Sequence, residues 1–279
     1  MRVVIFIIIC TALLGACAAP GRDVQVDLPL VIPDALYPEL SSKVSREPAQ
    51  SRVISFSKTL TLDNKGNFGM LAYTHQQQLF SFRQDGLLQV QTTASFQGPG
   101  GISKSVDQTL SLCGLVPVLG EAAGLSNSAM ATAASAGGAF LPLNFSLSLQ
   151  SATRRRLSRL EVDSSNLCQP TPGMEFSIQM ESEIQSKANG QVYSSNKQFT
   201  LTEQAKCKVG SDLLPASDLN SSMRGQYLAV SCAYTAEPSN DRKVEYAFLL
   251  ASGMYVGMGE VAKWQTDKAR YESVKYQSE

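Results

Sequence analysis

Apolar and polar residues alternate over short stretches along most of the chain from residue 52 onward, which is the pattern of strands that bury one face. The stretches that alternate in this way are 52–62, 67–74, 76–84, 87–96, 143–151, 175–187, 192–209, 225–236, 244–252, 255–264 and 270–276. Turn signals separate several neighbours, namely Asp85-Gly86, Asn189-Gly190 and Ser252-Gly253, and such dipeptides are typical of hairpins and turns. Short strands joined by tight turns predict a mainly β fold of antiparallel meanders and hairpins, arranged as a sandwich or a barrel.

The stretch 110–145 has a different composition, because small residues dominate it and Glu121 is its only charge. Small residues recur there at a spacing of four in two runs: Gly120 and Gly124 form the first, and Ala129, Ala133 and Gly137 form the second. This spacing lets helices approach one another closely. We therefore predict one small-residue helical segment around 114–140, packed on the protein's own sheet. A contact with another subunit or a membrane, and a disordered segment, are the alternatives.

The first sixteen residues have the layout of a secretory signal peptide. Arg2 gives a positive start, the core from Val3 to Leu14 is uncharged and apolar, and small residues follow. This core is too short to span a bilayer as a permanent helix. Residues 1–16 are therefore expected to be removed on export.

Residues 17–50 contain prolines at positions 20, 29, 33, 38 and 48, which forbid a long helix and predict an extended tether. An extended chain of this length reaches roughly 100 Å. Its apolar middle, residues 26–40, predicts packing along the edge of its own domain. The alternative is that it docks on another envelope protein as an added strand.

At the end of the leader, Leu14-Gly15-Ala16-Cys17 resembles the lipobox of bacterial lipoproteins. The resemblance is confined to the leader. It implies that the chain is cut before Cys17, that the Cys17 sulfur carries a diacylglycerol group, and that the new amino terminus is acylated, as with palmitate. Several acyl chains together hold a protein stably at a membrane.

The residue after the lipobox cysteine indicates which membrane of a Gram-negative envelope would hold the protein. In Gram-negative members of the class, an Asp at that place retains the protein at the inner membrane, and Ala18 stands there instead. The resemblance therefore implies the outer membrane, with the protein facing the periplasm. The alternative is an ordinary signal peptide cut near Ala19. Cys10 lies inside the apolar core and is expected to leave with the leader.

Four cysteines follow the leader, at Cys113, Cys168, Cys207 and Cys232. An even number in an exported chain predicts two disulfides, and four cysteines allow three pairings. We favour Cys207–Cys232, because both lie near strand segments of one compact region, and this leaves Cys113–Cys168. A zinc site is not expected, because close Cys-x-x-Cys spacing is missing and His75 is the only histidine. No metal or cofactor is predicted.

The charges of the chain bear on its partners. There are 24 basic and 24 acidic residues, with a net charge of +0, which argues against nucleic acid, since phosphate binding needs a clustered positive surface. One cationic cluster is a candidate contact for an anion or a partner protein, and its members are Arg154, Arg155, Arg156 and Arg159. The alternative is a solvated strand face.

No combination of residues predicts a catalytic site. His75 lies at an apparent turn, and no Gly-x-Ser-x-Gly motif supplies a nucleophile beside it. Ser55 and Lys58 match Ser-x-x-Lys, but residues three apart on an alternating strand point to opposite faces. Glu181 and Glu183 share one predicted strand face, where exposed carboxylates are common.

Two β regions are expected: residues 51–198 with the helical insertion, and residues 199–279 as a C-terminal disulfide-bonded module. The expected function is that of an outer-membrane-anchored lipoprotein of the bacterial envelope with a structural or binding role and no catalysis. Its partners would be the membrane, through the lipid, and an envelope protein. The alternatives are a subunit of a larger envelope or secretion assembly, and a periplasmic hydrolase acting on cell-wall or glycan material.

Overall fold

The computed structural model describes residues 53–64, 72–83, 87–98, 101–136, 139–162, 166–190, 194–237, 241–262 and 265–276. Its strands are β1 (Val53–Asn64), β2 (Ala72–Phe82), β3 (Leu88–Gly98), β4 (Gly101–Leu112), β5 (Val116–Ala136), β6 (Ala139–Val162), β7 (Glu175–Gly190), β8 (Ser194–Pro215), β9 (Gln226–Glu237), β10 (Arg242–Leu249), β11 (Met254–Ala262) and β12 (Gln265–Tyr276). A short 3-10 helix, η2 (Ala216–Asp218), follows β8. The prediction of a mainly β protein is confirmed.

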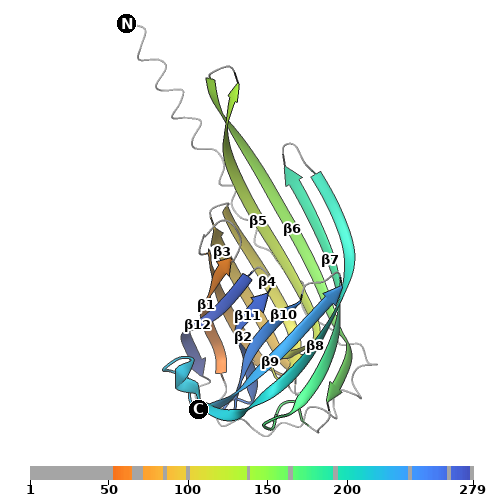
Figure 1. Ribbon diagram of the computed structural model, residues 1–279, viewed down its shortest axis with the longest axis vertical. Helices are drawn as coiled ribbons and strands as arrows, with labels where there is room; N and C mark the ends of the chain where they lie inside the picture. Colours follow the sequence, from red (N-terminus) through yellow and green to blue (C-terminus); the bar gives the residue numbers. More distant parts are fainter. Residues whose placement is uncertain are drawn as a thin grey trace.

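The strands form one closed antiparallel barrel. Each strand pairs with its neighbours in the chain, and β1 pairs with β12 to close the ring. Figure 1 shows this ring as the lower body of the molecule, with the hairpins β5–β6 and β7–β8 extending above it. A closed ring satisfies the edge hydrogen bonds that an open sheet would expose. Of the two arrangements that the sequence allows, the barrel is the one observed.

The pleat of each strand divides its residues between the inside and the outside of the barrel. On β8, Ala205, Cys207 and Val209 are buried, whereas Lys206 and Lys208 between them are exposed. This alternation is the pattern that the sequence shows over the same residues. The barrel therefore presents a polar outer face along this strand and an apolar inner one.

Two apolar clusters fill one end of the barrel, which we call the closed end. The ends of β9, β10 and β11 lie between the clusters, since both of their faces are buried. Phe248 and Tyr255 belong to one cluster, while the adjacent Leu249 and Met254 belong to the other. The first cluster also draws on β4 to β8, and the second on β1, β2, β3 and β12. The closed end is thus packed in three layers, and its core is thicker than a single ring of strands would allow.

Both disulfides lie in the first apolar cluster. Cys113 is joined to Cys168 with a Cα–Cα distance of 5.5 Å, and Cys207 to Cys232 with a Cα–Cα distance of 4.0 Å. Cys207 and Cys232 are direct partners in the β8–β9 ladder. The two pairings are those favoured from the sequence.

The predicted helix around 114–140 is wrong, because these residues form β5 and the start of β6. The four-residue spacing that suggested a helix is also an even spacing, so Gly120 and Gly124 share one face of a strand as well. A Cβ at Gly124 would lie 2.8 Å from the Ser151 Oγ, so the neighbouring strand comes close at that position. Pairing with β4 and β6 supplies the backbone hydrogen bonds that a helix would have made internally.

The predicted boundary between residues 198 and 199 falls inside β8. On both sides of it β8 pairs with β7, from Asn189↔Ser194 to Glu175↔Lys208. The two predicted β regions are therefore parts of one barrel.

Candidate functional site

Beyond the closed end, the inside of the barrel is a cavity of about 710 Å³, which we call the lumen. Residues of β2 to β10 and of the β4–β5 turn line it. Many of its lining side chains carry hydroxyl or amide groups, and these include Gln76, Gln78, Thr92, Ser105, Thr109, Ser111, Ser151, Thr153 and Ser182. Apolar side chains such as Val90, Ile184 and Leu201 lie among them, so the lumen is lined by both kinds of group and is closed at one end by an apolar core.

The period-two pattern of the strands places these polar groups inside. On β2, Gln76 and Gln78 line the lumen, whereas His75 and Gln77 are exposed on the other face. Gln78 Nε2 donates a hydrogen bond to Thr92 Oγ1 at 2.9 Å, across to β3. The Thr92 hydroxyl keeps its own proton to donate, so this wall of the lumen offers both donors and acceptors.

One ion pair lies on the β4–β6 side of the lumen. Arg155 Nη1 is 3.0 Å from Asp107 Oδ2, and Thr109 Oγ1 donates to Asp107 Oδ1 at 2.7 Å. The Asp107 carboxylate thus has a cation on one oxygen and a hydroxyl on the other.

A second charged group lies on the β8–β11 side. Arg242 Nη2 donates to Glu203 Oε1 at 3.0 Å, and Arg242 Nη1 donates to Glu260 Oε2 at 3.3 Å. Burial lowers the pKa of Arg242, but the charges of Glu203 and Glu260 together outweigh it, and the net shift is upward. The guanidinium stays charged, and its buried Nε–H makes no hydrogen bond to the described residues.

Two tyrosines complete this group. The Arg242 guanidinium lies 4.7 Å from the centre of the Tyr234 ring, and the Tyr234 and Tyr246 hydroxyl oxygens are 3.2 Å apart. Burial is the largest cause that raises the pKa of each tyrosine, so both phenols remain protonated. This side of the lumen combines a cation, two carboxylates and two hydroxyls around one aromatic face.

The charged groups of the lumen occur in pairs. Each of the lumen carboxylates Asp107 and Glu203 forms an ion pair with an arginine. Nowhere in the described ranges do three or more His, Cys, Asp or Glu side chains gather as a potential metal site. Hydroxyl, amide and paired charged groups around a concave site fit a ligand with many hydroxyl groups.

The predicted arginine cluster is divided by the β6 pleat, since Arg155 lines the lumen. The other three pair with carboxylates: Arg154 Nε with Glu121 Oε1 at 2.9 Å, Arg156 Nε with Glu181 Oε2 at 2.9 Å, and Arg159 Nη2 with Glu161 Oε1 at 2.5 Å. All four cations therefore have an acidic partner, and they do not converge on one anion site.

The other residues weighed from the sequence lie apart from the lumen or outside the described residues. His75 lies within β2, not at the predicted turn, and its Nδ1 is 3.1 Å from Thr59 Oγ1. Ser55 and Lys58 are three apart on β1, and Lys58 is buried near the aromatic rings of the second apolar cluster. Cys17 and the tether lie outside the described residues.

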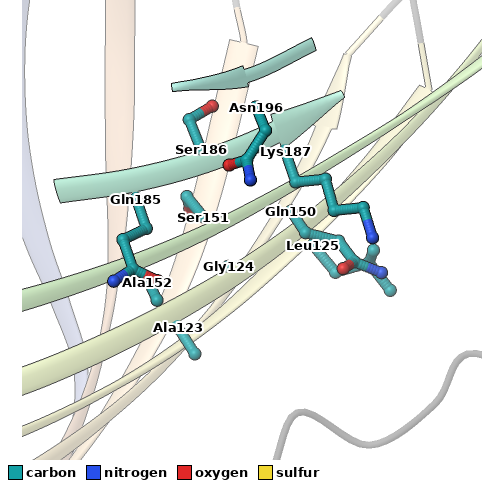
Figure 2. Close-up of a pocket in the computed structure, with 10 residues that line it drawn as sticks. All are labelled: Ala123, Gly124, Leu125, Gln150, Ser151, Ala152, Gln185, Ser186, Lys187 and Asn196. Atoms are coloured by element: carbon teal, nitrogen blue, oxygen red, sulfur yellow. The ribbon is translucent and has the colours of Figure 1, made fainter. Parts of the chain in front are cut away.

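A second hollow, of about 420 Å³, lies on the sheet formed by β5 to β8. Figure 2 shows the ten residues that line it, and among them Gln150, Gln185, Lys187 and Asn196 bring amide or amine groups. Three residues, Ala123, Gly124 and Ser151, line both this hollow and the lumen. The two hollows therefore share part of β5 and β6 as a wall.

Sequence reasoning missed the residues around Arg242, because they come from four different strands, β8 to β11, and meet only through the pairing of those strands. A local signal does exist, since Glu203 stands between Leu201 and Ala205 on the inward positions of β8. Arg242 likewise precedes Val244 on the inward positions of β10. A charge at an inward position of an alternating strand indicates a buried or lumen-lining ion pair.

Comparison of the chain with protein-family models, with curated proteins and with solved structures found no match. In the described part of the chain, no helix has the length and apolar character needed to cross a membrane.

Proposed function

We propose that this protein is a non-catalytic binding protein of the bacterial envelope, which takes a hydroxyl-rich ligand such as a glycan fragment into its lumen. The observation that carries the proposal is the lining of the lumen, where hydroxyl and amide groups surround two arginine–carboxylate groups. Acyl chains would leave these polar groups without hydrogen bonds, which disfavours a purely lipidic ligand.

In this proposal Cys17 carries the lipid that holds the protein at the outer membrane, and residues 18–50 give the barrel its reach into the periplasm. The outward positions of β8 fit this place, because Thr202, Gln204, Lys206 and Lys208 are all exposed and polar. A barrel whose wall lay in lipid would carry apolar residues there. An exported barrel would also form its two disulfides in the oxidising periplasm.

The alternative of a hydrolase acting on cell-wall or glycan material would use the same lumen. It has less support, because the lumen carboxylates are held by arginines and His75 lies on the outer face of β2. The alternative of a subunit in a larger envelope or secretion assembly draws on a different part of the molecule, the hairpin that extends beyond the ring.

Titration calorimetry with soluble peptidoglycan fragments tests the binding proposal. Thr92→Leu removes a hydroxyl from the lumen wall, and Thr93→Leu makes the same change at the exposed neighbouring position. We expect Thr92→Leu to weaken binding about tenfold, since a lost hydrogen bond is worth about 1 kcal/mol or more. Thr93→Leu should bind as the wild type does.

Absence of binding to the wild type, or equal loss in the two variants, would contradict the proposal. Mass spectrometry of the same incubations separates binding from hydrolysis, because a hydrolase would shorten the fragments while a binding protein would return them unchanged.

A further inference from the structure

The upper part of β8 has an open edge. β8 pairs with β7 from Ser194 to Lys208, but its pairing with β9 begins only at Thr202↔Glu237. Residues 194–201 therefore have no partner on their second side among the described strands. Figure 1 shows this part of β8 at the outer side of the hairpin β7–β8, above the end of β9.

The backbone groups that face this edge follow from the hydrogen-bond pattern lower on β8. The Cα atoms of Cys207 and Cys232 are 4.0 Å apart, which is the close spacing of an antiparallel pair that exchanges no hydrogen bonds. Val209 N donates to Met174 O at 2.9 Å, on the β7 side. Odd-numbered residues of β8 thus bond to β7, and the unbroken β7–β8 register carries this parity to the top of the strand. The N–H and C=O groups of the even-numbered residues between 194 and 200 therefore point to the open edge.

The side chains along this edge do little to prevent association. Open edges in water are usually protected by charged residues, by proline or by a bulge. From Ser194 to Leu201 the only charged residue is Lys197, there is no proline, and the β7–β8 register has no shift. Phe199 lies in this part of the strand with 49% of its surface exposed. The edge thus offers free backbone hydrogen bonds beside an apolar side chain, which is the combination that an added strand uses.

We propose that two copies of this chain pair antiparallel through this edge of β8, so that their sheets become one. A second copy fits because the edge is complementary to itself. The even-numbered residues of the two copies must face one another to exchange hydrogen bonds, so the pairing is centred on position 197, 198 or 199. Centring it on Gln198 pairs residues 195–201 of each copy and uses the open edge up to Thr202, where β9 begins to pair.

Charge and length select this register among the three. Centring on Lys197 would place two ammonium groups directly opposite each other, which is destabilising. Centring on Phe199 would leave only residues 197–201 paired, because Thr202 already pairs with β9. Centring on Gln198 places Lys197 opposite Phe199 of the other copy, where the cation and the ring attract each other. This inference does not depend on ligand binding in the lumen.

Disulfide cross-linking tests the register. In this register the two Gln198 Cα atoms would lie about 5.5 Å apart, which is within the range of a disulfide. The full-length protein with Gln198→Cys is purified in mild detergent and oxidised. Gln204→Cys is the matched control, because Gln204 is also exposed on the outer face of β8 but pairs with Thr235 of β9. We expect more than half of the Gln198→Cys protein to run as a covalent dimer on a non-reducing gel, and the Gln204→Cys protein to run as a monomer.

Sedimentation in the same detergent tests the side-chain contact. The wild type is expected to be a dimer. Phe199→Lys should weaken association about tenfold or more, because it puts a second cation opposite Lys197 and removes the apolar contact. Adding Lys197→Glu should restore the dimer, which also shows that the variant chain is folded. Leu213→Lys is the matched control, because Leu213 is 48% exposed on β8 and lies outside the open edge, and it should remain a dimer.

The other outcomes overturn the proposal. A monomeric wild type, or equal cross-linking at positions 198 and 204, would mean that the edge does not pair with itself. Failure of Lys197→Glu to restore the dimer would contradict the register. An oligomer larger than a dimer would contradict pairing between like edges and would point to the second open edge, on β5 beyond the Gly101↔Ser128 pair.

Discussion

Lys58 is a charged residue in an apolar place. It lies on β1 with 7% of its surface exposed, and its Nζ is 5.7 Å from the centre of the Phe56 ring and 6.0 Å from that of Tyr271. No carboxylate of the described residues forms an ion pair with it. Burial lowers the pKa of Lys58 to about 8. The two aromatic faces offset only part of the cost of burying the ammonium.

This burial predicts a dependence of stability on pH. The pKa of Lys58 is lower in the folded state than in the unfolded state, so the unfolded state binds more protons between about pH 8 and pH 10.5. The free energy of unfolding should therefore rise with pH through this window, and the cost of the buried charge should be fully present below pH 8. Lys58→Met should stabilise the protein at pH 7 by up to roughly 3 kcal/mol and remove this rise.

Urea unfolding at pH 7 and pH 10 measures both effects. Lys206→Met is the matched control, because Lys206 is exposed on β8 and its removal should change the free energy of unfolding by less than about 0.5 kcal/mol. Equal unfolding free energies for Lys58→Met and the wild type at pH 7 would show that Lys58 is not buried as a charge.

The turn between β4 and β5 shows how a single loop closes the barrel end. Cys113 and Gly114 both have positive φ, 53° and 87°, and Leu115 N donates to Leu112 O at 3.0 Å, as in a type I′ turn. Tyr255 N donates to Cys113 O at 2.8 Å. The turn is thus joined to β11 by this bond and to the β6–β7 connection by the Cys113–Cys168 disulfide.

Gly114→Ala should destabilise the protein for two separate reasons. The added Cβ would lie 2.8 Å from Tyr255 O, and the positive φ disfavours any residue with a Cβ. Gly173 also has a positive φ, 79°, but a Cβ there would meet nothing within 4 Å. We expect thermal or urea unfolding to show a loss of about 1 kcal/mol for Gly173→Ala and two to three times that for Gly114→Ala. Equal losses would mean that the turn can move away from β11.

Export and membrane anchoring are properties of the whole chain. Substitutions at the two cysteines of the first seventeen residues, Cys10 and Cys17, test them separately. Cys17→Ala should release the protein from the membrane fraction into the soluble periplasmic fraction, because the lipid attachment point is lost. Cys10→Ala should remain with the outer membrane, since the leader that contains Cys10 is removed. Fractionation followed by mass spectrometry of the amino terminus measures both. Membrane retention of Cys17→Ala would remove the anchor from the proposed function.

Much of the strand pattern could be predicted because its signal is local. The alternation on β7 and β8, the Asn189-Gly190 turn signal and the Ser252-Gly253 turn each involve residues close together in the chain. The pattern around 114–140 predicts a helix wrongly, because small residues at a spacing of four fit a helix and a strand equally well. Only the pairing of β5 with β4 and β6 separates the two possibilities.

The sequence by itself determined the strand-forming stretches and the even set of cysteines, because period-two alternation and cysteine count are properties of the chain. The tertiary structure alone decided that β1 meets β12, that Arg242 meets Glu203 and Glu260, and that a lumen with many polar groups lies above an apolar closed end. The physical reason is that closure and inward ion pairs depend on the order and register of all the strands together. No single segment carries that information, since each strand can pair with any other of similar pattern until the ring is complete.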